Sequence, residues 1–127
     1  MIDMQQIRID FITLSGQRKK HLERIVINIP GSVSEVLVGE KLESVKNMLP
    51  ENGVVIITDE NVYRIYGGRF PDFPVFTITP GEESKRLSTI EDLAGRLMDA
   101  GIDRDGFILA IGGGVVCDIA GFLGSVY

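Results

Sequence analysis

Two uninterrupted apolar runs constrain the fold of this chain more than any other feature of its sequence. One spans residues 53–58 and the other residues 107–111, and both are rich in branched side chains. Runs of this kind are typical of strands that are buried on both faces, as in a parallel sheet covered by helices. They therefore predict an α/β domain rather than a sheet with one solvated face.

Helical patterns lie between these strands. The sequence predicts a short helix near residues 61–66, a strand at 75–78 and a further helix from about Val116. A capping box at residues 88–91 would begin an amphipathic helix that Gly101 ends, and its apolar positions are Ile90, Leu93, Ala94, Leu97 and Met98. This order predicts a Rossmann-like, mostly parallel sheet with helices on both faces.

The N-terminal strands are expected to be partly antiparallel. Residues 7–11 and 25–29 alternate in a way that predicts strands with one buried face, and residues 15–17 would turn the chain between them. A short strand at 36–38 and an amphipathic helix that ends at Pro50 are predicted next. The apolar positions of that helix are Leu42, Val45, Met48 and Leu49.

Composition predicts one domain over residues 1–127, in the cytoplasm. The chain has 127 residues and one cysteine, so a core can form without disulfides and a reducing compartment is suitable. No run approaches the roughly 20 apolar residues of a membrane span. A net charge of −5 argues against nucleic acid and anionic lipid as partners.

Three consecutive glycines, Gly112 to Gly114, follow the second apolar run. Glycine lets the backbone approach an anion closely, and the N–H groups of the next helix would face it, which suits a pyrophosphate. The alternative is a tight turn without a ligand. The ordinary dinucleotide fingerprint is disfavoured, because Cys117 occupies the place of its last glycine and the candidate acid Asp59 precedes the loop.

Polar residues also follow the neighbouring strands, and the ends of parallel strands converge. Asp59 could bind a ribose diol together with Asn61, or simply cap a helix. Glu82 and Lys85 could face one ligand or pair with each other, and Asp118 would gain from the helix dipole in either case. Cys117 is interpreted as a packing residue, and the single histidine, His21, cannot build a metal site alone.

Three of these segments together resemble the 3-dehydroquinate synthase family. Residues 112–122, with Tyr127 beyond them, resemble the family's glycine-rich signature. Residues 80–85 resemble its Gly-Glu-x-x-Lys segment, and residues 58–62 its Thr-Asp-x-Asn-Val segment. All three occur in the family's order, so the resemblance covers the chain from about Val26.

The resemblance implies an NAD- and metal-dependent phosphorus–oxygen lyase of the shikimate pathway, which leads to chorismate and the aromatic amino acids. Such an enzyme converts 3-deoxy-arabino-heptulosonate 7-phosphate into 3-dehydroquinate and phosphate. By resemblance, Asp59 and Asn61 would hold the adenosine end of NAD, and the glycine loop its pyrophosphate and nicotinamide side. The full set of expected cofactor-binding residues is Asp59, Glu60, Asn61, Glu82, Glu83, Ser84, Lys85, Gly113, Gly114, Val115 and Asp118.

The family's helical C-terminal domain is not expected within these 127 residues. In the family, that domain carries the metal ligands, so a divalent metal (Zn or Co) is expected only in a full-length enzyme. No catalytic or metal-binding residue is therefore assigned in this chain, and it is expected to be inactive by itself. Because an interdomain face would be exposed, a homo-oligomer is expected.

Other interpretations stay open. Another sugar-phosphate cyclase would share the NAD loop, and polyol dehydrogenases share the fold. Polyol dehydrogenases usually carry a serine after the glycines, where this chain has Val115. A non-enzymatic nucleotide-binding module is the third alternative, and titration with NAD would discriminate it.

Overall fold

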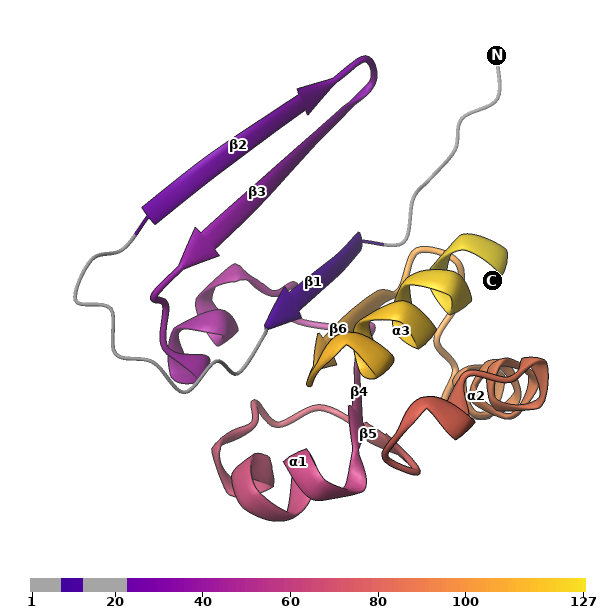
Figure 1. Cartoon of the computed structure of the whole chain (residues 1–127). Coiled ribbons are helices and arrows are strands. Elements are labelled where there is room, and N and C mark those ends of the chain that lie inside the picture. Colours follow the sequence, from indigo (N-terminus) through magenta and orange to yellow (C-terminus); the bar gives the residue numbers. More distant parts are fainter. Residues whose placement is uncertain (1–7, 13–22) are drawn as a thin grey trace.

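A four-stranded sheet forms the centre of the molecule (Figure 1). The structure is a computed structural model that describes residues 8–12 and 23–127. The strands lie in the order β1, β6, β4, β5, and every neighbouring pair is parallel. Their bounds are Arg8–Ile12 for β1, Val54–Asp59 for β4, Val75–Ile78 for β5 and Phe107–Ile111 for β6. The predicted parallel sheet is therefore confirmed.

Helices cover both faces of this sheet. Alternate residues of β4 and β6 point to opposite sides, so Val55 and Ile108 belong to one core and Val54 and Leu109 to the other. The helices α2 (Leu87–Asp99) and α3 (Gly114–Val126) pack on the first side. The 3₁₀ helix η1 (Leu42–Met48) and the helix α1 (Glu60–Tyr66) pack on the second.

The helix predicted from residue 88 begins elsewhere. Arg86 occupies the N-cap position of α2 and makes no side-chain capping bond, so the predicted capping box is wrong and Ser88 lies inside the first turn. Gly101 follows the helix with φ of +69°, a conformation that favours glycine, as predicted. The helix α3 begins at Gly114, two residues before the predicted start.

The N-terminal third differs most from the prediction. Strands β2 (Glu23–Ile29) and β3 (Ser32–Val38) form a separate antiparallel hairpin, while β1 joins the parallel sheet beside β6 (Figure 1). All residues of β2 are exposed, so the expected buried face is wrong for this strand. The predicted turn at residues 15–17 lies outside the described residues.

The remaining elements are short. The expected amphipathic helix before Pro50 is the 3₁₀ segment η1, in which Leu42 and Val45 are buried but Met48 is 44% exposed. Two further 3₁₀ turns, η2 (Gly67–Arg69) and η3 (Glu82–Ser84), follow α1 and β5. Within residues 8–12 and 23–127, no helix has the length and apolar character needed to cross a bilayer.

Candidate functional site

The carboxyl ends of β6, β4 and β5 lie along one edge of the sheet. These three strands are parallel neighbours, so the segments that leave them begin side by side. The segments are the glycine loop with α3, the helix α1, and the turn η3 (Figure 1). The convergence predicted from the sequence is therefore present, and the candidate site is this edge.

The three glycines of the loop differ in what surrounds them. Gly112 is buried, and a methyl group there would lie 2.6 Å from Cγ2 of Val116, so internal packing requires the glycine. Gly113 and Gly114 are exposed, and a methyl group on either would meet no atom within 4 Å among residues 8–12 and 23–127, its chain neighbours aside. Neither has a positive φ. The fold itself does not require glycine at these two positions, which leaves the main chain open to close approach from outside.

The helix α3 begins at this open backbone. Gly113 is its N-cap residue and has no side-chain group to accept a hydrogen bond from the first amides. The first N–H groups of a helix lack partners within the helix and carry a partial positive charge. The carbonyl of Gly113 accepts the bond from the amide of Cys117 at 3.1 Å, so the first turn is fully formed. This end of α3 is suited to an anion.

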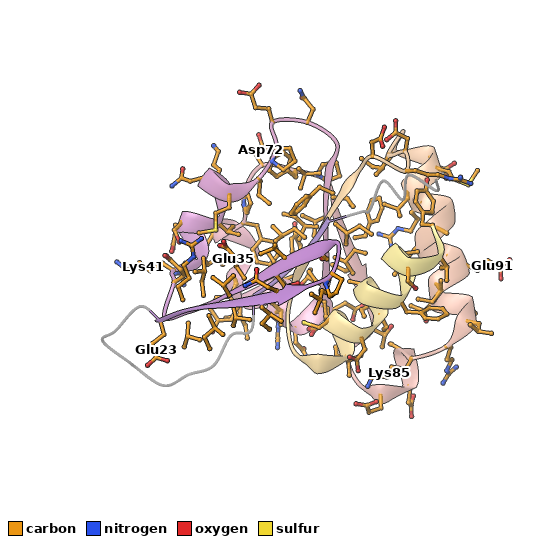
Figure 2. All side chains as sticks on the ribbon, turned by 90° about the horizontal axis from the view of Figure 1, so that it is seen from above. Glu23, Glu35, Lys41, Asp72, Lys85 and Glu91 are labelled. Carbon is orange, nitrogen blue, oxygen red and sulfur yellow. The ribbon has the colours of Figure 1, made fainter. Side chains whose placement is uncertain are left out.

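Lys85 connects the η3 turn to α3. Its Nζ lies 2.9 Å from Oε2 of Glu82 and 2.8 Å from Oδ2 of Asp118, one turn into α3. The hydrogen bond to Asp118, followed by that to Glu82, raises the pKa of Lys85 above its ordinary value. Figure 2 shows Lys85 at the edge of the molecule. The structure thus brings three predicted site residues into one ion-paired group.

Asp59 acts as a helix cap. Its Oδ1 accepts a hydrogen bond from the amide of Val62 at 2.9 Å, which begins α1. Glu60 and Asn61 follow in the exposed first turn, where Oδ1 of Asn61 lies 3.5 Å from Nη2 of Arg64. Among the described residues, no hydrogen bond or ion pair joins this turn to Lys85 or to the glycine loop.

The other predicted residues are divided between surface and interior. Glu83 is exposed in η3, whereas Ser84 is buried and its hydroxyl donates to the carbonyl of Thr79. Val115 is half-buried and packs against the core beneath α2 and α3. Ser84 therefore shapes the turn before Lys85, and cofactor contacts for these three residues stay a prediction.

Two features of the site were missed by sequence reasoning. Thr58 is fully buried, and its hydroxyl donates to the carbonyl of Ile111 at 2.6 Å, which ties the end of β4 to the residue before the glycines. A polar residue that closes an apolar run was the available signal. A cleft of about 250 Å³ also lies beside the Lys85–Asp118 pair, lined by Lys85, Arg86, Leu87, Ile90, Asp118, Ile119 and Phe122.

Cys117 lies one residue before Asp118 in α3 and is half-buried. Burial, followed by the charge of Asp118, raises the pKa of the thiol, so the group is protonated at neutral pH. This agrees with its interpretation as a packing residue. In the part of the chain that the structure describes, no group of three or more His, Cys, Asp or Glu side chains could hold a metal ion.

Comparisons with known proteins identify relatives of this chain. Residues 75–127 match the family described as 3-dehydroquinate synthase N-terminal. The 3-dehydroquinate synthase of Alkaliphilus metalliredigens is 30% identical over 84% of this chain and 32% of its own length. That of Clostridium acetobutylicum is 34% identical over 84% of this chain and 29% of its own length. That of Acidithiobacillus ferrooxidans is 42% identical over 62% of this chain and 24% of its own length.

A solved structure has a similar fold. The structure of 2-deoxy-scyllo-inosose synthase in complex with carbaglucose-6-phosphate, NAD⁺ and Co²⁺ matches with a TM-score of 0.59 and 26% sequence identity. The match covers 84% of this chain and 32% of that protein. The chain thus spans about a third, or less, of the relatives described here. Sequence and fold together show that the chain belongs to the 3-dehydroquinate synthase family, as a counterpart of its N-terminal domain.

Proposed function

We propose that the edge formed by the glycine loop, η3 and the start of α3 binds NAD. The observation that carries the proposal is the open backbone at Gly113 and Gly114, where no atom of the described residues beyond the chain neighbours would contact a methyl group within 4 Å. A glycine that neither packing nor φ requires is expected where another molecule approaches the main chain. The amides at the start of α3 would face the diphosphate.

The charged residues of the edge have distinct parts in this proposal. Lys85 would offer its ammonium to the cofactor while Glu82 and Asp118 hold that group in place. Because its pKa is raised, Lys85 is charged at every physiological pH. One carboxylate oxygen of Asp59 already caps α1, so its second oxygen would accept the ribose hydroxyls, beside the exposed Asn61. The remaining residues of the predicted set are Glu60, Glu83, Ser84 and Val115.

We further propose that the whole protein is a 3-dehydroquinate synthase. It would release phosphate from 3-deoxy-arabino-heptulosonate 7-phosphate in the cytoplasm, as a step toward chorismate and the aromatic amino acids. When bound, NAD would oxidise a ring alcohol of the substrate and later return the hydride. We assign no metal site to the described residues, since they offer no ligand set.

Titration calorimetry with NAD tests the cofactor proposal. Gly114→Ala should weaken binding by about tenfold or more, which corresponds to about 1.4 kcal/mol, because the new methyl group would occupy the approach to the backbone. The substitution does not clash with the protein. The matched control is Gly95→Ala, at an exposed helical glycine of α2 that is equally open. Wild-type affinity in Gly114→Ala, or no heat from the folded wild-type chain, would contradict the proposal.

A second candidate is another sugar-phosphate cyclase. The similarity to 2-deoxy-scyllo-inosose synthase, whose structure holds a carba analogue of glucose 6-phosphate, favours it. Phosphate release by the complete protein distinguishes the two candidates. Release from the heptulosonate phosphate supports a 3-dehydroquinate synthase, and release from glucose 6-phosphate supports the alternative.

A further inference from the structure

Thr58 is the one polar residue among the buried residues of β4. The residues before it in the strand, Val54 to Ile57, are apolar and 0–2% exposed, and Thr58 is 0% exposed. Burying a hydroxyl costs free energy unless the group is hydrogen-bonded. The hydroxyl of Thr58 donates to the carbonyl of Ile111 at 2.6 Å. Since valine would fill a similar space without a polar atom, the hydroxyl at this position has a use that burial alone does not explain.

The place of this hydrogen bond in the sheet indicates that use. Thr58 and Ile111 are the last pair of residues in register between β4 and β6. One residue later both segments leave the sheet, where Asp59 caps α1 and Gly112 begins the glycine loop. Among the described residues, no other side-chain hydrogen bond joins these two strand ends. The bond therefore holds together the segments that carry the two halves of the proposed NAD site.

We propose that Thr58 is a positioning residue for the cofactor, which sets the spacing between Asp59 and the glycine loop. This inference rests on the NAD-binding function proposed above. NAD would place its adenosine ribose at Asp59 and its diphosphate at the backbone of Gly114, and these two parts belong to one molecule. A ligand that spans two subsites gains affinity over its separate parts only while their spacing matches the ligand. Thr58 is buried, so it acts through the spacing and not by contact.

The chain on either side of the bond has little room to adapt. A methyl group at Gly112 would already lie 2.6 Å from Cγ2 of Val116, which is 1% exposed. The cap of Asp59 fixes the first turn of α1 to the end of β4. A shift of either strand end would therefore be transmitted to the part of the site that follows it.

Comparison of NAD with its separate parts tests the positioning role. Thr58→Val removes the hydroxyl and keeps a branched side chain. It should raise the dissociation constant for NAD, measured by calorimetry, about three- to tenfold, the range that one hydrogen bond supports. The dissociation constants of adenosine and of inorganic pyrophosphate, measured by NMR titration, should stay at their wild-type values. Each of these ligands occupies one subsite only, so neither senses the spacing.

Two further variants serve as controls, and circular dichroism checks the fold of each. Thr58→Ser keeps the hydroxyl and should restore the affinity for NAD. Tyr127→Phe also removes a hydroxyl that donates to a distant carbonyl, that of Ile102 at 2.7 Å. Tyr127 follows the end of α3 and Ile102 precedes β6, away from the carboxyl ends of the strands. Its replacement should therefore leave the affinity for NAD unchanged.

The possible outcomes separate this inference from the proposed function. Three results would overturn the positioning role and leave NAD binding intact: unchanged affinity for NAD in Thr58→Val, equal weakening of NAD and both of its parts, or a Thr58→Ser variant that binds NAD more weakly than the wild type. The absence of heat when NAD is added to the folded wild-type chain would contradict the proposed function, and this inference with it.

Discussion

The β2–β3 hairpin and the strands β4 and β6 are built from similar residues and have opposite environments. Both regions are rich in isoleucine and valine. In β4 and β6 these side chains are 0–2% exposed, except for Phe107 at 4%, whereas those of β2 are 46–57% exposed. The difference lies in the neighbours: β6 has a strand on each side and helices above and below, whereas among the described residues β2 pairs with β3 alone.

This contrast shows that branched apolar residues favour a strand, whereas the burial of that strand depends on the elements that pack against it. A central parallel strand is covered because helical connections return over both faces of its sheet. A hairpin closed by a tight turn, here with Gly31 at φ of +82°, needs no such connection. Within the part of the chain that the structure describes, its apolar residues stay about half-exposed.

The contrast between β2 and β6 would be contradicted most directly if similar truncations in the two strands lowered the free energy of unfolding equally. Leu109→Ala, at a fully buried position of β6, should lower the free energy of unfolding by about 2–5 kcal/mol. Ile27→Ala, at a half-exposed position of β2, should lower it by less than about 1 kcal/mol. Urea unfolding at the lowest workable protein concentration measures both. Equal losses would show that the hairpin is packed within one molecule.

The contrast can be sharpened within the glycine loop, where buried and open backbone lie two residues apart. Gly112→Ala should destabilise the chain by about 1–3 kcal/mol, because the methyl group would overlap Val116, which is 1% exposed. Gly114→Ala should leave stability unchanged or raise it by up to about 1 kcal/mol, since it sits in open space within a helix. Thermal unfolding of both variants measures these changes in stability. A destabilised Gly114→Ala variant would show that protein atoms pack against the backbone of Gly114.

The smallest change in stability is expected at the ion pairs of Lys85, because solvent screens exposed charges. Its pKa is raised in the folded chain, so its contribution to stability is complete below the ordinary lysine value of about 10.4. The contribution is lost as the pH rises through the folded pKa. Lys85→Met should therefore lower the urea midpoint slightly at pH 7, and the difference from the wild type should vanish at strongly alkaline pH.

Lys46→Met provides the control for this measurement. No ion pair of Lys46 is found within residues 23–127, so its replacement should change the midpoint equally little at both pH values. A difference at Lys85 that grows with pH would contradict the assigned direction of its pKa shift.

Sequence patterns were sufficient to predict the elements in which the spacing of apolar residues reflects their burial. The apolar runs of β4 and β6 and the periodic residues of α2 placed the parallel sheet and its longest helices correctly. The convergence of strand ends followed from the parallel topology alone. The glycine loop was found because three glycines after a buried strand are uncommon.

The rest depends on residues far apart in the sequence. Lys85 pairs with Asp118, and Thr58 bonds to Ile111, and neither contact has a local pattern. The capping box at residue 88 failed because the chain enters α2 two residues earlier than its local sequence suggests. The exposure of β2 was not predictable, because alternation marks a strand without showing what covers it.

The protonated state of Cys117 provides a reporter of events at the glycine loop. This thiol is the only one in the chain, and it lies next to Asp118 in the helix that begins at the loop. Alkylating reagents attack the thiolate, so a half-buried thiol with a raised pKa is modified slowly while α3 is intact. The rate of labelling therefore reports any change in the exposure or ionisation of this thiol, such as a ligand at the glycine loop would cause, without any engineered probe.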